Sequence, residues 1–217
     1  MQPITSRSVV EQATDELRRA ILAGTLAPGA EYSLREMAGM LGISFIPIRE
    51  ALRSLESEGL VTLRPGRSAV VAPLDLDDLH GIYRLRRTLE PEIARRSCVL
   101  LTDKELDRLE ALAVDFGGRD HGISDIYDGH HAFHLALLAP AATSWDIRLL
   151  TTLWRAAERY IRIGFGQLDP DPAEHERREQ AHTGLVAAFR TRDPDAVASA
   201  VEAHLARNEK IAIAALS

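Results

Sequence analysis

The fold of this chain is decided by residues 33–71, which read SLREMAGMLGISFIPIREALRSLESEGLVTLRPGRSAVV. Two runs with apolar residues at helical spacing are joined by a turn that is centred on Gly42. Two short β-rich runs follow, on either side of the Arg-Pro-Gly-Arg segment 64–67, which is typical of a hairpin turn. This order of elements predicts a winged helix-turn-helix, a module that places its second helix in the major groove of DNA.

Capping residues mark the ends of the predicted helices. Ser33 and Glu36 have the Ser-x-x-Glu spacing of a capping box, and Gly42 can adopt the left-handed conformation that ends a helix. Ser44 is a suitable N-cap for the second helix of the motif. A further capping box and a stripe of apolar residues predict an earlier helix over residues 9–23.

Charges in the first 75 residues are nearly balanced, with eight arginines, no lysine and nine acidic residues. Arg49 and Arg53 lie one turn apart on the second helix of the motif, off its apolar stripe, while Arg35 lies on the first helix and Arg67 in the wing. We expect these arginines to form a local basic face for DNA phosphates, although the net charge of the chain is −6. The alternative is that they are ordinary solvated charges.

The composition fits a folded protein of two modest domains, with 217 residues of which 46% are hydrophobic. Cys98 is the single cysteine, which excludes an intrachain disulfide and fits a reducing compartment. No apolar run approaches the roughly 20 residues that span a bilayer, and no signal peptide is recognised. We therefore expect a cytoplasmic protein that has no membrane partner.

Helical periodicity dominates after Pro73, and strand-like runs disappear. We predict a winged helix-turn-helix domain over residues 1–74 and an all-helical bundle over residues 75–217, so the fold class is mainly α. About six helices are expected in the bundle, over residues 76–97, 103–117, 124–139, 144–166, 173–191 and 194–214.

Four of the eight histidines fall on inward-facing stripes of the predicted helices. His130 and His134 are one turn apart on one helix, and His182 and His204 each lie on the apolar stripe of a further helix. Four buried imidazoles without partners would leave several polar atoms unsatisfied. A divalent metal ion would satisfy them, and imidazole suits Zn, Ni, Cu, Fe or Co. The alternatives are hydrogen-bonded core histidines, or a second register in which His131 faces inward.

Both halves of the chain contain short motifs that can be compared with known families. In the first half they occupy residues 21–29, 41–44, 47–52 and 55–61, and in the second half they comprise Arg86, Glu90, Phe133, His134, His182, Asp193 and His204. Through these motifs the chain resembles the GntR family of bacterial transcription regulators, specifically the FadR branch, whose second domain is the helical FCD type. The resemblance implies a ligand-responsive regulator, most often a repressor, that acts as a homodimer on a palindromic double-stranded DNA operator.

The resemblance also implies which residues contact the operator. The matching positions are Arg35, Ser44, Phe45, Ile46 and Arg49, with Arg67 in the wing, and the charge pattern adds Arg53. Phe45 and Ile46 depart from the family, which usually has Arg followed by Thr at these positions. Arg can bond guanine through two hydrogen bonds, whereas Phe offers only apolar contact, for example to a thymine methyl group. We therefore expect an unusual operator sequence, and weaker DNA binding is the alternative.

A metal site in the helical domain is a further implication, because FCD domains often hold a metal through one Asp and three His. The three matching histidines are His134, His182 and His204, and His130 falls at the position of the Asp. Loss of the carboxylate removes one negative charge from the ligand set. This change favours softer metals, with zinc or nickel as the expected cofactor, and strengthens the capture of an anionic effector.

Effectors in this family are small organic acids or related metabolites, and Arg86 matches a position expected to line their site. The alternative role of Arg86 is a salt bridge to Glu90, four residues further along the same helix. A metal-dependent enzyme is a competing function, but the segment 130–134 lacks the Glu that zinc proteases place between their histidines. Four protein ligands would also fill the open position that catalysis needs. We therefore expect no enzyme, and a metal sensor without an organic effector is the remaining alternative.

Overall fold

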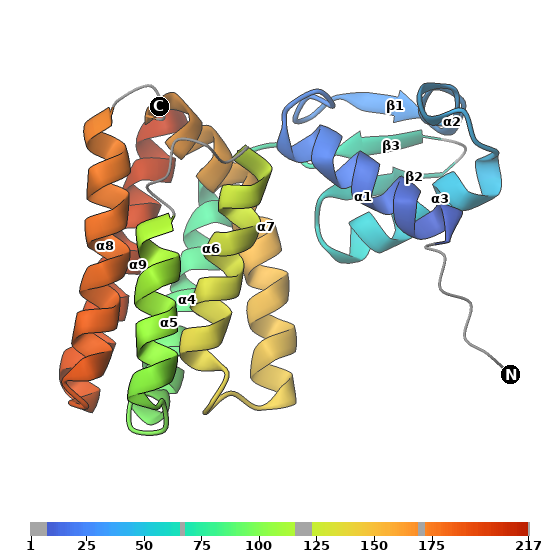
Figure 1. The fold of residues 1–217 in the computed structure, drawn as a ribbon. Coiled ribbons are helices and arrows are strands. Elements are labelled where there is room, and N and C mark those ends of the chain that lie inside the picture. Colours follow the sequence, from blue (N-terminus) through green and yellow to red (C-terminus); the bar gives the residue numbers. More distant parts are fainter. Residues whose placement is uncertain (1–7, 66–67, 116–122, 169–171, 217) are drawn as a thin grey trace, which may run out of the picture. The chain divides into compact units, whose positions relative to one another are not determined.

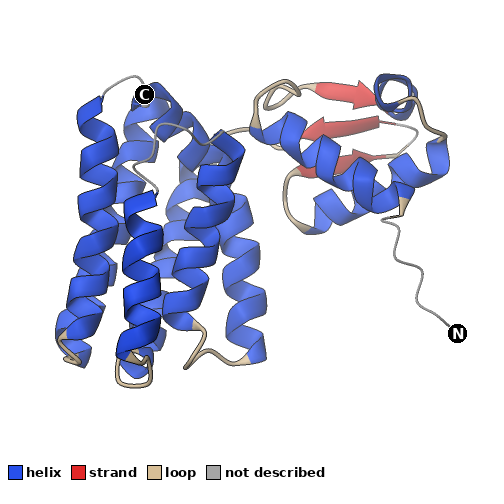
Figure 2. Cartoon of the chain, in the orientation of Figure 1, coloured by secondary structure: helices blue, strands red, loops and turns tan. Residues whose placement is uncertain are grey.

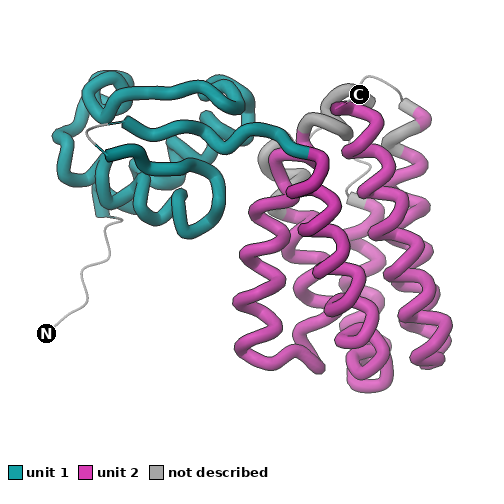
Figure 3. Tube along the Cα trace, turned by 180° about the vertical axis from the view of Figure 1, so that it is seen from behind, with its two compact units in different colours: residues 1–75 teal, residues 76–217 magenta. Residues whose placement is uncertain are grey.

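The computed structural model of the chain describes residues 8–65, 68–115, 123–168 and 172–216 (Figure 1). The chain divides into two compact units, residues 1–75 and residues 76–217 (Figure 3). The first unit combines helices with a small sheet, and the described part of the second unit is built from helices (Figure 2). Among the described residues, no helix has both the length and the apolar character that a membrane span requires.

The first unit has the predicted winged helix-turn-helix and one strand that the sequence pattern did not predict. Its elements are α1 (Val9–Leu22), β1 (Glu31–Ser33), α2 (Leu34–Leu41), α3 (Phe45–Ser57), β2 (Val61–Arg64) and β3 (Ser68–Val71). The three strands form an antiparallel sheet in the order β1-β3-β2. The missed strand, β1, has three residues, which is too short to display the alternating pattern by which strands are recognised.

The helix-turn-helix begins with the predicted capping box. The Ser33 hydroxyl accepts from the Glu36 backbone N–H at 3.1 Å, and the Glu36 carboxylate accepts from the Ser33 backbone N–H at 2.7 Å. Gly42 ends α2 in the left-handed conformation, with φ at 65°. The prediction for Ser44 is wrong in one respect, because it holds the N-cap position of α3 but its side chain makes no capping hydrogen bond. Pro47 occupies the N3 position of α3, where a capping side chain often finds its donor, and proline has no N–H to offer.

One face of α3 fills the centre of the first unit. Ile48, Leu52 and Leu55 lie on this face and are fully buried. They pack with apolar residues of α1, α2 and the two wing strands, which include Leu17, Met37, Val61 and Ala69. The opposite face of α3 is therefore left at the surface, as the helical spacing predicted.

The second unit is a bundle of long helices. They are α4 (Leu76–Ser97), α5 (Asp103–Asp115), α6 (Ile123–Leu138), α7 (Ser144–Leu168), α8 (Pro172–Arg190) and α9 (Pro194–Leu216). The predicted boundaries that fall on described residues agree with the structure to within two residues, and the predicted end at residue 117 lies outside the described residues. The helix α4 packs against α7 and α9, while α8 packs against α5 and α9. The mainly α fold class and the six predicted helices are thus confirmed.

Candidate functional site

Three helices of the second unit bring together the four histidines that were predicted as metal ligands. His130 and His134 lie on α6, His182 lies on α8, and His204 lies on α9. One ring nitrogen of each histidine lies within 4.8 Å of those of the other three. The ring centroids of five of the six pairs are 4.4 to 5.5 Å apart. We call these four residues the histidine cluster.

The histidine cluster lies in the interior of the bundle. His134, His182 and His204 are 7%, 2% and 7% exposed, and His130 is half-buried. The fully buried Phe133 ring meets the rings of His134 and His182 edge-on, each at a centroid distance of 5.3 Å. This apolar wall keeps water away from one side of the cluster, so its polar atoms depend on partners within the protein or on a bound ligand.

Hydrogen bonds set the orientation of the buried rings. His182 Nδ1 donates to the backbone carbonyl of Arg178 at 2.7 Å, so the lone pair of this ring resides on Nε2. The side-chain amide of Asn208 forms a hydrogen bond with His204 Nε2 at 3.1 Å. Within the described part of the chain, the buried Nδ1 of His204 has no hydrogen-bond partner. On α6, the Nε2 atoms of His130 and His134 lie 3.2 Å apart.

Burial keeps the histidine cluster uncharged at neutral pH. It lowers the pKa of His182 to about 4. For His130, His134 and His204, burial first, and second the repulsion that a protonated neighbouring histidine would exert, hold the pKa well below the usual range. Neutral imidazoles have a free lone pair, which is the protonation state that metal ligation requires.

Arg86 of α4 forms the salt bridge that the sequence offered as its alternative role. Its Nε donates to Glu90 Oε1 at 2.7 Å, and the same oxygen accepts from the indole Nε1 of Trp154 at 2.9 Å. The guanidinium group also lies 5.0 Å from the centroid of the Tyr83 ring. Arg86 is 2% exposed. Its charge lowers the pKa of His134, although burial and the neighbouring histidines are the larger causes of that shift. The buried cation is therefore close enough to the histidine cluster to act on it electrostatically.

Two other histidines lie apart from the cluster. The ring of His131 stacks on Trp154 at a centroid distance of 6.2 Å, so the register that would turn His131 into the cluster is not the one observed. His80 is exposed on α4, and its Nδ1 lies 2.9 Å from a carboxylate oxygen of Glu209. His121 falls outside the described residues.

The outer face of α3 carries most of the predicted DNA-binding residues. Ser44, at the N-cap position, and Phe45, Ile46, Arg49 and Arg53 are all exposed. The large apolar side chains of Phe45 and Ile46 are 53% and 77% exposed. Arg53 forms a salt bridge with Glu50 at 3.0 Å, which ties it partly to its own helix.

The remaining predicted DNA-contacting arginines are Arg35 on α2 and Arg67 in the wing. Arg35 is exposed on α2, and among the described residues neither Arg35 nor Arg49 forms a salt bridge. Arg67 lies outside the described residues. The uncommitted side chains of Arg35 and Arg49 are suited to phosphate contacts, since no carboxylate competes for them.

The sequence pattern did not predict several residues that support the histidine cluster and Arg86. Asn208 lies four residues after His204, and Arg178, whose carbonyl accepts from His182, lies four residues before it. Both partners follow the one-turn spacing of a helix, so that spacing was the signal for them. The link between Trp154 and Glu90 joins residues 64 positions apart and leaves no local pattern.

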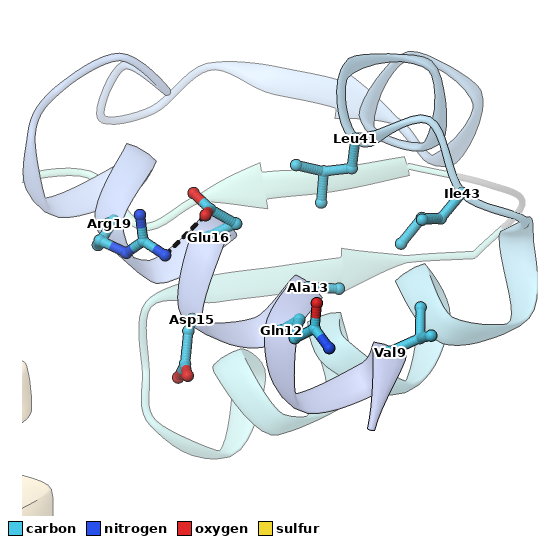
Figure 4. Close-up of a pocket in the computed structure, with 8 residues that line it drawn as sticks. All are labelled: Val9, Gln12, Ala13, Asp15, Glu16, Arg19, Leu41 and Ile43. Carbon is cyan, nitrogen blue, oxygen red and sulfur yellow. Dashed lines mark hydrogen bonds and ion pairs between the residues drawn. The ribbon is translucent and has the colours of Figure 1, made fainter. Parts of the chain in front are cut away.

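A surface hollow of about 320 Å³ lies in the first unit, between α1 and the turn that joins α2 to α3 (Figure 4). Its lining combines apolar side chains, among them Val9 and Ile43, with the ion pair of Glu16 and Arg19 at 2.7 Å. None of the predicted DNA-binding or metal-binding residues lines it. The hollow is thus separate from both candidate sites.

Family models match both units of the chain. The model of the FCD domain matches residues 81–207, and the model of bacterial regulatory proteins of the gntR family matches residues 9–71. The HTH-type transcriptional repressor RspR of Escherichia coli K12 is 26% identical over 208 residues, which make up 92% of this chain and 87% of RspR. The HTH-type transcriptional regulator McbR of the same strain is 25% identical over 194 residues, or 87% of this chain and 85% of McbR.

A solved structure agrees with the fold along nearly the full chain. The structure of E. coli McbR/YncC has a TM-score of 0.78 at 23% identity and covers 98% of this chain and 100% of its own. At this identity the likeness supports the fold alone. The two matched family models, which together span residues 9–71 and 81–207, establish the family. Proteins of the gntR family are regulators that bind DNA operators, and they are not enzymes. The chain belongs to the GntR family of bacterial transcription regulators, with a helix-turn-helix domain followed by an FCD domain.

Proposed function

We propose that this regulator is a cytoplasmic, homodimeric repressor whose FCD domain binds a divalent metal ion and a small carboxylate effector. In the proposal, α2, α3 and the wing bind a palindromic operator, and the effector changes the affinity for that operator. The observation that carries the proposal is the convergence of four neutral histidines from three helices, with one ring nitrogen of each within 4.8 Å of the others. Such convergence costs free energy unless the ring nitrogens find partners.

One ring nitrogen of each residue in the histidine cluster lies within 4.8 Å of the others, and the pair on α6 has the spacing of two ligands to one metal ion. Bonds of 2.0 to 2.1 Å from zinc to two imidazole nitrogens at a tetrahedral angle place those nitrogens about 3.3 Å apart. The Nε2 atoms of His130 and His134 are 3.2 Å apart. Ligation would also give a partner to the buried Nδ1 of His204, while the bond from His182 Nδ1 to the Arg178 carbonyl is the kind that orients a metal-binding imidazole.

Four imidazoles indicate which metals suit the site. Calcium and magnesium prefer oxygen ligands, whereas imidazole nitrogen suits zinc and nickel, and we infer one of these two. When bound, the ion supplies a positive charge that neutral ligands do not offset. Arg86 offers hydrogen-bond donors nearby: Glu90 balances its charge and accepts its Nε–H, while the guanidinium group has further N–H donors for a ligand.

A carboxylate is the effector chemistry that this environment favours. A bound dication together with the buried Arg86 attracts an anion into the interior, where electrostatic interactions are stronger than in water. Arg86 is in our proposal the effector-binding residue, held in place by Glu90, which in turn accepts from Trp154. The salt bridge to Glu90 thus serves to position Arg86 rather than to replace its role.

Metal analysis of the purified full-length protein tests this proposal. After incubation with zinc or nickel and dialysis, we expect about one ion per chain, because four histidines would fill one tetrahedral set of ligands. His134→Ala should lower the affinity by more than the roughly 10- to 100-fold that loss of an outer-shell partner costs. His80→Ala is the matched control, since this exposed histidine lies outside the cluster, and it should retain the ion. A wild type that takes up neither metal, or a His134→Ala variant that retains it fully, would contradict the metal site.

A metal sensor is the second candidate function. The observation in its favour is that four histidines converge. Four protein ligands would complete a tetrahedral set, as structural zinc sites do, and would leave no position for an organic ligand on the metal. In that case operator binding should follow metal concentration and ignore every carboxylate. A response to a carboxylate in the metal-loaded protein would instead support the first candidate.

A further inference from the structure

We propose that the first turn of α3 selects the operator by apolar contact between Phe45 and Ile46 and the methyl groups of thymine. This inference rests on the operator binding of the proposed function and adds the base feature that the helix reads. It concerns side chains that are exposed and adjacent in the sequence, so it can be tested without disturbing the core.

Phe45 and Ile46 are not part of the hydrophobic core of the first unit. Phe45 and Ile46 are 53% and 77% exposed, while Ile48, Leu52 and Leu55 on the opposite face of α3 are fully buried. The core of the first unit is thus filled without the pair. Two adjacent large apolar side chains at a surface suggest a binding role, because their contact with water is unfavourable until a partner covers them.

The surroundings of the pair are suited to DNA. The first turn of α3 contains no acidic residue, whereas the first turns of α1 and α2 contain Glu11 and Glu36. Ser44 precedes the pair with a hydroxyl group that does not cap the helix, and Arg49 follows one turn later at the surface. The positive end of the helix dipole and an arginine next to the apolar pair complement phosphate charge.

The chemistry of the pair identifies the base. In helix-turn-helix proteins the N-terminal residues of the second helix contact base edges in the major groove. Phe45 and Ile46 have no hydrogen-bonding group in their side chains, so they cannot read the donors and acceptors of guanine, adenine or cytosine. The apolar feature of the major groove is the C5 methyl group of thymine. Thymine methyls at the positions facing the first turn of α3 are therefore the expected target.

Replacement of thymine by deoxyuridine tests the inference, because it removes the methyl group and keeps the base pairing. The full-length protein first selects duplexes from a randomised DNA library, and the selected duplex is then made with deoxyuridine at each thymine in turn. At one or more positions in each half-site, we expect affinity to fall about fourfold per methyl, the value that corresponds to burial of one methyl-sized group. Deoxyuridine at the other thymines should leave the affinity unchanged.

Variants separate the apolar contact from general DNA binding. The double variant Phe45→Ala/Ile46→Ala should bind the thymine and deoxyuridine duplexes equally well. Arg49→Ala should bind both more weakly but retain the ratio between them, since its contact is electrostatic. Phe45→Arg should select guanine where the wild type selects thymine, because arginine can form two hydrogen bonds to guanine. Thermal unfolding of each variant checks whether the substitution at the exposed position leaves the fold intact.

Each outcome has a defined meaning. Equal affinity of the wild type for the thymine duplex and for all deoxyuridine duplexes would overturn the inference while leaving operator binding in place. The same conclusion would follow if the double variant Phe45→Ala/Ile46→Ala kept the discrimination, or if it changed self-association and not DNA affinity. Selection of no duplex by the wild type would contradict the operator binding on which the inference rests.

Discussion

His130 determines the charge of the proposed metal centre. The resemblance to FCD domains implies that an aspartate is common at this position, and the Nε2 of His130 lies 3.2 Å from that of His134 on the same helix. With histidine at this position, all four candidate ligands are neutral imidazoles. The substitution should therefore leave a bound ion with more of its positive charge, which favours an anionic effector.

Arg49 carries a prediction at the residue scale. Arg49→Ala should weaken operator binding by about 1 to 3 kcal/mol and, if the contact is to phosphate, reduce the salt dependence by about one ion. The reason is that Arg49 is exposed on the outer face of α3 and forms no salt bridge within the described residues. Fluorescence anisotropy of a labelled selected duplex at several salt concentrations measures both quantities.

Arg19→Ala is the control for this measurement. Arg19 is also an exposed arginine of the first unit, but it lies on α1 and is paired with Glu16 at 2.7 Å. Its removal should leave DNA affinity and salt dependence as in the wild type. Equal affinities of Arg49→Ala and the wild type would show that α3 does not bind DNA through this side chain.

The histidines could be predicted from the sequence because each follows a helical repeat. His130 and His134 are one turn apart, and His182 and His204 each continue an apolar stripe, so an inward position was predicted for all four, with a register that turns His131 inward as the alternative. The environment of Arg86 could not be predicted in the same way. Its partner Glu90 is one turn away, but Trp154 reaches that carboxylate from a different helix.

At the scale of elements, a serine holds the N-cap position of both α2 and α3, which allows the two caps to be compared. Ser33 takes part in a capping box with Glu36, whereas Ser44 holds the corresponding position of α3 without a capping hydrogen bond. Ser33→Ala should therefore destabilise α2 by about 1 kcal/mol, while Ser44→Ala should cost much less than that. Hydrogen exchange of the amides in α2 and α3, followed by mass spectrometry, measures each local effect. Equal losses of protection in the two variants would contradict the role assigned to the capping box.

Element boundaries were predictable where local chemistry marks them. The helix α5 begins directly after Thr102, which forms another capping box with Glu105 in the first turn of the helix, and prolines open α8 and α9. The strand β1 has no such marks. Its pairing with β3, for example Tyr32 opposite Ala69, joins residues that are distant in the sequence, and three residues do not reveal a period of two.

At the scale of the molecule, the helix that follows the first unit is linked to a helix of the histidine cluster. The helix α4 begins directly after the boundary at Asp75, and α9 carries His204. His80 and Arg87 of α4 both contact Glu209 of α9, at 2.9 and 3.3 Å. A ligand at the cluster that shifts α9 would thus act on α4, and this offers a route by which an effector changes DNA affinity. These pairs are separated by more than a hundred residues, so no local pattern in the sequence predicted them.

DNA affinity measured with and without ligands tests the central claim, that ligands of the histidine cluster control the DNA-binding domain. Anisotropy of one selected duplex is recorded for the full-length protein after chelation, after zinc loading, and after zinc loading with each of several small carboxylates. We predict that zinc or at least one carboxylate changes the affinity of the wild type, and that His134→Ala, which still binds the duplex, responds to neither. A wild type whose DNA affinity is the same under all these conditions, or a His134→Ala variant that responds like the wild type, would contradict the account.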